Sequence, residues 1–262
     1  MSEVTQHAPG TFCWPELATK DPLAAKAFYS ALFGWGIKDQ DMGPMGVYTV
    51  FTLNGKEVAA AHGMDPNQSA QGVPPHWFSY ISADNVDASL EEAKKLGGNV
   101  LGGPFDVADN GRMGIVLDAT GAAFGIWQAN KTIGIQLLDQ AGTLVWNELL
   151  SSNAGAIQDF YAKLFGWGIQ LHDMGPVKYT VYTRGEVPAA GMMQMTADMG
   201  PMPSNWLPYF GSDDVDATAA KTRELGGSVM MPPGDVPNIG RFTVLQDPQG
   251  AVFGIFKFLP RP

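Results

Sequence analysis

The sequence predicts an α+β fold in which one strand–helix–strand plan occurs four times, in two tandem repeats. Three observations lead to this prediction. The chain of 262 residues contains two similar halves at a nearly constant spacing. Its 32 glycines and 19 prolines indicate many turns between short elements. Hydrophobic residues make up 45% of the chain and charged residues 16%, so it can bury a core.

The duplication is clearest in a segment with the pattern FY-x-x-LFGWGI. Residues 28–37 carry it first, and residues 160–169 carry it again, at an offset of 160 − 28 = 132. Towards the C-terminus the offset becomes 247 − 118 = 129, as Asp118 and Asp247 show. We therefore predict an N-terminal tail (1–9), a first repeat (10–130), a linker (131–141) and a second repeat (142–259).

Each repeat contains the plan twice. In the first repeat a strand at 11–18 precedes Asp21-Pro22, an N-cap followed by a proline that suits the first turn of a helix. The helix ends at Gly34, and Asn54-Gly55 predicts a hairpin between strands at 48–53 and 58–64. The plan then recurs, as these ranges show: strand 77–83, helix 86–96, and strands near 100, 113–117 and 123–128. This order predicts mixed sheets with helices on one face, the other face being packed or curled around a cavity.

Composition also limits the partners. Sixteen Lys and Arg against 26 Asp and Glu give a formal charge of −10, which disfavours nucleic acid and anionic membranes. No segment approaches the roughly 18 apolar residues of a membrane helix, and the N-terminus lacks a signal-peptide pattern. We expect a cytoplasmic protein whose partner is a small molecule. The lone Cys13 excludes an intrachain disulfide and a multi-cysteine zinc site.

These motifs resemble the vicinal-oxygen-chelate superfamily, which includes glyoxalases, bleomycin-resistance proteins and extradiol dioxygenases. The resemblance spans about residues 10–258 and rests on the FY-x-x-LFGW segments and on the hairpin 247–255 (DPQGAVFGI). The duplicated form is similar to a two-repeat, glyoxalase-like antigen of mycobacteria. The resemblance implies four βαβββ units whose curved mixed sheets surround open cavities, with helices outside.

In that superfamily the cavity usually holds a divalent metal on His, Gln or Glu side chains. The corresponding positions here carry side chains that cannot bind such an ion, namely Trp14, Phe78 and Gly125 in the first repeat and Trp146, Leu207 and Gly254 in the second. The remaining ligand position falls within 58–64 or 187–194, where His62 is the one good donor. The sequence therefore predicts neither a metal nor another cofactor. Ala18 and Leu150 replace the glutathione-binding arginine of glyoxalase I.

Strand alternation extends the candidate site. If Trp14 faces the cavity, Phe12 and Glu16 share its face, and Trp127 lies on the face of Gly125. The second repeat gives the matching set Trp146, Glu148, Gly254 and Phe256. The aromatic residues are predicted to bind a flat apolar ligand. Glu16 and Glu148 are candidates for acid–base catalysis. The alternative is a structural role in which a backbone amide, or an arginine such as Arg112 or Arg241, holds the carboxylate.

Three functions remain open at this stage. The first is a metal-free protein that binds a small aromatic or apolar ligand. The second is a metal-dependent lyase, isomerase or dioxygenase of the glyoxalase type. The third is an interaction module with vestigial cavities. The sequence does not decide whether the protein is an enzyme. It also leaves open whether the protein is a monomer or a homodimer, and whether the units pair within the chain or across a dimer.

Overall fold

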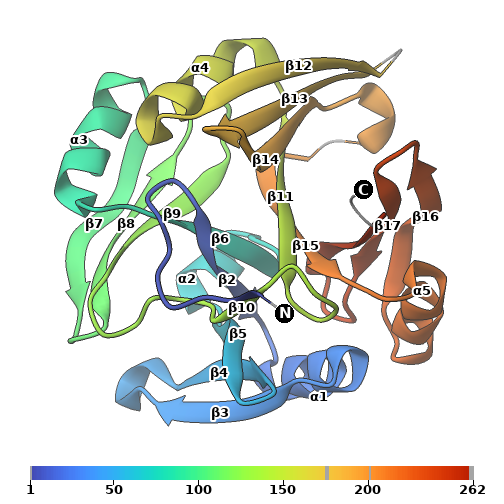
Figure 1. Ribbon diagram of the computed structural model, residues 1–262. Coiled ribbons are helices and arrows are strands. Elements are labelled where there is room, and N and C mark those ends of the chain that lie inside the picture. Colours follow the sequence, from blue (N-terminus) through green and yellow to red (C-terminus); the bar gives the residue numbers. More distant parts are fainter. Residues whose placement is uncertain (1, 175–176, 201, 260–262) are drawn as a thin grey trace.

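The computed structural model describes residues 2–174, 177–200 and 202–259 (Figure 1). Its helices are α1 (Pro22–Phe33), α2 (Pro66–Ala70), α3 (Val86–Lys95), α4 (Ala154–Phe165) and α5 (Val215–Glu224), with 3-10 turns η1 (Gly43–Met45) and η2 (Ala197–Met199). The first repeat contributes strands β2 (Phe12–Thr19), β3 (Gly36–Asp41), β4 (Val47–Leu53), β5 (Lys56–Gly63), β6 (His76–Ser82), β7 (Asn99–Val107), β8 (Gly111–Leu117) and β9 (Ala123–Ala129). The second contributes β11 (Leu144–Ser151), β12 (Gly168–Met174), β13 (Val177–Arg184), β14 (Val187–Gln194), β15 (Asn205–Gly211), β16 (Ser228–Val236), β17 (Gly240–Gln246) and β18 (Val252–Phe258).

Each repeat forms one eight-stranded mixed sheet. The strand orders are β3-β4-β5-β2-β6-β9-β8-β7 and β12-β13-β14-β11-β15-β18-β17-β16. The two units of a repeat join through the antiparallel pairs β2–β6 and β11–β15, so units pair within the chain. The predicted α+β fold with two tandem repeats is thereby confirmed. The remaining strands, β1 (Ser2–Glu3) and β10 (Leu137–Leu138), pair the predicted tail with the predicted linker.

Local sequence signals place the helices. The Asp21 carboxylate accepts hydrogen bonds from the amides of Leu23 and Ala24, and Gly34 ends α1 with a left-handed φ of 72°. Asn153 and Gly166 serve the same two roles for α4. The sequence did not predict β3, because its residues are all exposed and carry no apolar alternation.

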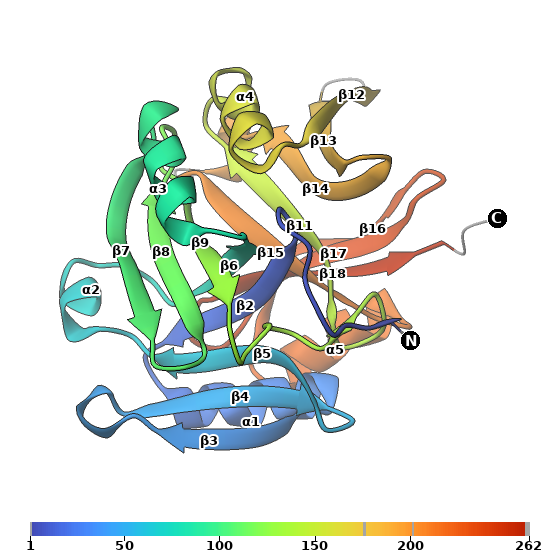
Figure 2. The same ribbon diagram turned by 60° about the vertical axis from the view of Figure 1, so that its left-hand side comes forward.

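The core joins the two repeats crosswise. One buried cluster combines α1 residues such as Phe28 with Phe253 and Ile255 of β18. The other combines Phe124 of β9 with α4 residues such as Phe160. Figures 1 and 2 show the helices α1, α3, α4 and α5 around the periphery of the two curved sheets. Each half of one repeat therefore depends on the opposite half of the other for its buried apolar surface.

Two buried tyrosines connect the repeats by hydrogen bonds. Tyr29 of α1 donates to Asp247 at 3.0 Å, and Tyr161 of α4 donates to Asp118 at 2.8 Å. Trp77 and Trp206 donate their indole N–H groups to these hydroxyls, each at 3.0 Å. Burial and the neighbouring carboxylates raise the pKa of both tyrosines well above the usual range, so both hydroxyls remain donors.

The faces of the two sheets have different roles. Ser79 of β6 donates to Asn147 of β11 at 2.9 Å, and both side chains are buried between the sheets. Leu17 is also buried on this side, in the cluster that contains α1. Alternation then places Trp14 and Glu16 on the opposite face of the first sheet. We call this opposite face of each sheet its inner face.

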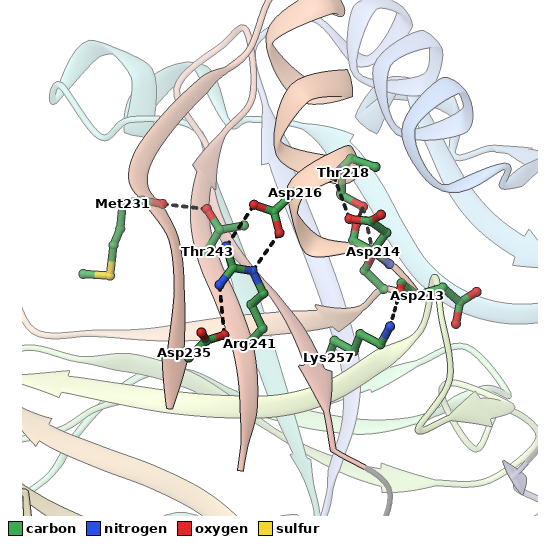
Figure 3. A network of polar contacts seen from close by, with 11 residues as sticks. Asp213, Asp214, Asp216, Thr218, Met231, Asp235, Arg241, Thr243 and Lys257 are labelled. Atoms are coloured by element: carbon green, nitrogen blue, oxygen red, sulfur yellow. Dashed lines mark hydrogen bonds and ion pairs between the residues drawn. The ribbon is translucent and has the colours of Figure 1, made fainter. Parts of the chain in front are cut away.

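The two predicted structural arginines do not contact Glu16 or Glu148. Arg241 of β17 binds Asp216 of α5 through two nitrogens and Asp235 of β16 through a third (Figure 3). Arg112 makes the equivalent contacts with Asp87 and Asp106. Their carboxylate partners are more than half exposed, so these ion pairs add little to stability. The proposed pairing of an arginine with either glutamate is therefore wrong.

The crosswise tyrosines provide a stability test. Tyr29→Phe leaves one oxygen of the buried Asp247 without its side-chain donor, so we expect a loss of about 1–3 kcal/mol in the free energy of unfolding. Tyr161→Phe should behave alike through Asp118. Urea titration followed by circular dichroism measures both losses. Tyr182→Phe, whose hydroxyl bonds a backbone carbonyl instead, is the control and should cost less; equal costs for all three variants would contradict this account.

Candidate functional site

The central feature of the first inner face is a chain of hydrogen bonds that ends on Glu16. Trp14 donates its indole N–H to the Tyr48 hydroxyl at 2.9 Å. Tyr48 donates to Glu16 Oε1 at 2.6 Å, and Tyr80 donates to Glu16 Oε2 at 3.0 Å. Each carboxylate oxygen thus has a phenol donor, and the Trp14 ring is fixed at its nitrogen.

The register of four adjacent strands assembles this chain. Glu16 of β2 pairs with Ala60 of β5 on one side and with Phe78 of β6 on the other. Trp14 pairs with Tyr80 two residues earlier on β2, which is the next position on the same face. Tyr48 comes from β4, one strand beyond β5. Residues far apart in sequence therefore meet because alternate positions of neighbouring strands share one face.

The second repeat contains the same arrangement. Trp146 donates to the Tyr179 hydroxyl at 3.1 Å, and Tyr179 donates to Glu148 Oε1 at 2.7 Å. Tyr209 donates to Glu148 Oε2 at 3.0 Å. The whole Trp–Tyr–Glu–Tyr unit, which we call the carboxylate clamp, is therefore duplicated with the fold.

Electrostatics fix the direction of these hydrogen bonds. Burial, followed by the charge of Glu16, raises the pKa of Tyr48 and Tyr80 well above 10. Burial and Glu148 do the same to Tyr179 and Tyr209. Burial also raises the pKa of Glu148, although its two phenol donors act in the opposite direction. The phenols therefore stay protonated and the carboxyl oxygens act as acceptors.

The residues of the clamp stand at or beside the positions that the resemblance assigns to metal ligands. The positions implied for metal ligands hold Trp14, Phe78 and Gly125, and Glu16 is engaged by two phenols. Among the described residues, no group of three or more His, Cys, Asp or Glu side chains is arranged to hold a metal ion. The side chains present therefore do not fit the divalent metal that the resemblance implies.

Glycine at the third ligand position has a steric reason. A Cβ built on Gly125 would lie 2.1 Å from Cδ1 of Tyr80, and a Cβ on Gly254 would lie 2.1 Å from Cδ1 of Tyr209. Each tyrosine ring covers the glycine on its neighbouring strand. The ring that holds the carboxylate thus occupies the place where a larger ligand residue would stand.

One predicted site residue lies elsewhere. Phe12 pairs with Ile81 while Trp14 pairs with Tyr80, so β2 contains a bulge between them. The bulge turns Phe12 to the core, where its ring centre is 5.0 Å from that of Trp206. The expectation that Phe12 faces the cavity is therefore wrong, because strict alternation fails at the bulge.

The other predicted residues lie on or beside the inner faces. Phe78 and Trp127 are half-buried, and Trp127 donates to the Thr132 carbonyl at 3.0 Å while its ring packs beside Gly111. Leu207 and Phe256, at 4% and 9% exposure, form an apolar cluster with Tyr209 that also contacts Trp146. The second inner face is thus filled by apolar side chains, whereas the first is more open. The catalytic role expected of Glu16 and Glu148 stays a prediction.

Sequence reasoning missed the four clamp tyrosines. Tyr48 and Tyr179 stand in matching strands of the two repeats, as do Tyr80 and Tyr209. The sequence shows that these tyrosines recur in both repeats. It does not show that they contact Glu16 and Glu148, because only the register of the sheet brings them together.

One surface cavity lies away from both clamps. It has a volume of about 380 Å³ and is lined by the segments around Glu3, Lys56 and Lys131. It contains no predicted site residue. This cavity is therefore not the site predicted from the sequence.

Comparison with known proteins identifies the family. The sequence profile of the Glyoxalase/Bleomycin resistance protein/Dioxygenase superfamily matches residues 11–126 and 143–255. The chain therefore belongs to this superfamily, as its motifs predicted. None of the described helices has the length and apolar character needed to cross a membrane.

Individual relatives cover nearly the whole chain. "Putative glyoxylase CFP32" of Mycobacterium tuberculosis is 42% identical over 100% of both chains. "Anthracycline biosynthesis protein DnrV" of Streptomyces peucetius is 34% identical over 97% of this chain and 95% of its own. Among solved structures, the Mn(II)-bound glyoxalase of Novosphingobium aromaticivorans superposes with a TM-score of 0.67 at 18% identity, over 95% of this chain and 82% of that one. The 2,3-dioxygenase LapB of Pseudomonas sp. KL28 gives 0.63 at 12%, over 100% and 96%.

The raised pKa of Glu148 predicts a pH-dependent stability difference. Below the ordinary glutamate pKa of 4.5 the group is protonated in both the folded and unfolded states and carries no ionisation penalty. As the pH rises above that value, the unfolded state ionises first and the folded state loses stability until the pH passes the folded pKa. Glu148→Gln removes this loss. Its Tm should therefore rise relative to the parent protein as the pH increases above about 4.5.

The control for this experiment is Glu91→Gln, because Glu91 lies exposed on α3. Thermal unfolding at several pH values, read by circular dichroism, measures both variants. A Tm difference between Glu148→Gln and the parent protein that does not change with pH would contradict the raised pKa of Glu148.

Gly125→Ala tests the packing of the clamp. The new methyl group would overlap the Tyr80 ring and displace its hydroxyl from Glu16, so we expect a loss of about 1–3 kcal/mol in unfolding free energy. Gly63→Ala is the matched control, since its nearest contact would be Cγ of Pro22 at 3.7 Å. Denaturant titration compares the two, and a Gly125→Ala protein as stable as Gly63→Ala would refute the close ring contact.

Proposed function

We propose that the first repeat binds a small planar aromatic or apolar molecule on its inner face, without a metal. The observation that carries this proposal is the carboxylate clamp. The Tyr48 hydroxyl accepts the indole N–H of the half-buried Trp14, next to a carboxylate that orients a polar group of the ligand. An aromatic surface with a few fixed polar groups is what small-molecule sites require.

The first repeat is the better candidate of the two. Its inner face carries half-buried Phe78 and Trp127, where the second carries buried Leu207 and Phe256. The two glutamates differ little, since the Glu16 side chain is 12% exposed and Glu148 is 8% exposed. A ligand therefore finds aromatic surface in the first repeat, while the second repeat already covers the equivalent surface with its own side chains.

The relatives support a planar ligand. DnrV, 34% identical to this chain, is described as an anthracycline biosynthesis protein. Anthracyclines contain fused planar rings, which suit stacking on an indole. CFP32 is described as a glyoxylase, and this favours metal-dependent lyase or isomerase chemistry as the second candidate. The ligand positions Trp14, Phe78 and Gly125 argue against that chemistry here.

Tryptophan fluorescence tests the proposal. Titration with a planar probe such as 1-naphthol should quench the protein saturably, because the probe stacks on Trp14. Trp14→Ala should weaken binding by about tenfold, since an aromatic stacking surface contributes about 1–3 kcal/mol when ligand burial is included.

Trp146→Ala is the matched control, because it removes the equivalent ring from the filled second repeat. We expect the Kd of this variant to equal that of the parent protein. The proposal fails if no planar probe quenches the fluorescence saturably, or if Trp14→Ala binds the probe as tightly as the parent.

A further inference from the structure

The two clamps differ at one polar position. His62 of β5 lies beside the first clamp, with Nε2 3.7 Å from Glu16 Oε2 and its ring stacked on Tyr48 at a centroid distance of 6.4 Å. The same register position in the second repeat is Met193, since His62 pairs with Tyr48 and Met193 pairs with Tyr179. The imidazole is thus an addition to one copy of a duplicated unit.

The hydrogen atoms around His62 can be assigned from its partners. Nδ1 lies 2.9 Å from the carbonyl oxygen of Gly63, which can only accept, so Nδ1 carries the proton. In the neutral ring Nε2 is then an acceptor. Glu16 Oε2 is also an acceptor, already bonded by Tyr80. Two lone-pair atoms therefore face each other across 3.7 Å, too far apart for a hydrogen bond between them.

We propose that this pair of acceptors binds a primary amino group, so that the ligand of the first repeat is a planar aromatic molecule carrying an aliphatic amine. This inference rests on the function proposed above and specifies its ligand. The ammonium nitrogen donates one hydrogen to Glu16 Oε2 and another to His62 Nε2. The aromatic part of the ligand lies against Trp14.

The number of donor hydrogens favours an amine over a hydroxyl as the polar group of the ligand. An ammonium group has three donor hydrogens on one atom and satisfies both acceptors, whereas a hydroxyl has one and leaves an acceptor unpaired. The phenols of Tyr48 and Tyr80 already donate to Glu16, as does the Trp14 indole to Tyr48. The donor hydrogens of these three side chains are therefore already used within the clamp. What remains for a ligand is acceptor atoms and the faces of aromatic rings, and both attract a cation.

The charge of the surroundings agrees with this assignment. Glu16 is the acidic residue of the clamp, and the whole chain has a formal charge of −10. Two other basic groups share the inner face of the first sheet. Lys38 lies exposed on the edge strand β3, three strands and about 14 Å from β2. His76 of β6 uses Nδ1 on the Pro74 carbonyl at 2.9 Å.

Three naphthalene probes test the inference by isothermal titration calorimetry at neutral pH: 2-naphthylmethylamine, 2-naphthylmethanol and 2-methylnaphthalene. They share the planar ring and differ in the polar group. We expect the amine to bind at least about tenfold more tightly than the other two, because a charged hydrogen bond contributes about 1.5–3 kcal/mol.

His62→Met, which installs the residue of the second repeat, removes one of the two acceptors and should lower this preference while retaining ring binding. His62→Leu, which also lacks an acceptor, serves as a second variant with a different side-chain shape and should lower the preference as well. His172→Met makes the same substitution in the second repeat and should leave it unchanged.

Equal Kd values for the three probes, or an amine preference that His62→Met leaves unchanged, would overturn this inference and leave the proposed function standing. Binding of none of the probes would overturn both. A preference present in the parent protein, lowered in His62→Met and unchanged in His172→Met supports the amine site.

Discussion

Two phenol hydroxyls hold one carboxylate on the inner face of each sheet, and the organisation of the site depends on this interaction. Glu16 accepts from Tyr48 and Tyr80, and Glu148 accepts from Tyr179 and Tyr209. The tyrosine rings require glycine on the adjacent strand, and the hydroxyl of one tyrosine fixes a tryptophan. The clamp is thus a hydrogen-bonded arrangement that four adjacent strands of each sheet build together.

Duplication has kept the architecture and altered one surface. The crosswise pairs Tyr29–Asp247 and Tyr161–Asp118 are equivalent in the two repeats, as are the clamps. The inner faces differ, with His62 against Met193 and half-buried Phe78 against buried Leu207. Shared contacts support the common core, because each repeat buries apolar surface of the other. The differing contacts lie on the inner faces, where the first repeat has His62 and the less buried aromatic rings.

The sequence predicted the fold well and the site in part. The repeated motif FY-x-x-LFGWG predicted the two repeats. Asp21 and Gly34 predicted the two ends of α1, because helix capping depends on local sequence. Trp14 followed from the resemblance to the superfamily, and Glu16 followed from strand alternation beginning at Trp14. Phe12 was misplaced because a bulge depends on pairing with β6, which local sequence does not encode. The tyrosines were missed because they reach Glu16 from β4 and β6, across strand pairs that only the assembled sheet defines.

The central claim is that the carboxylate clamp has taken the place of the metal site of the superfamily. Calorimetric titration of Mn(II) and Zn(II) into purified, chelator-treated protein tests it most directly, with Glu16→Gln titrated in parallel. The account predicts no saturable binding at the inner faces, and the same titration curve for the parent and the variant. Stoichiometric binding of either ion that Glu16→Gln abolishes would contradict it.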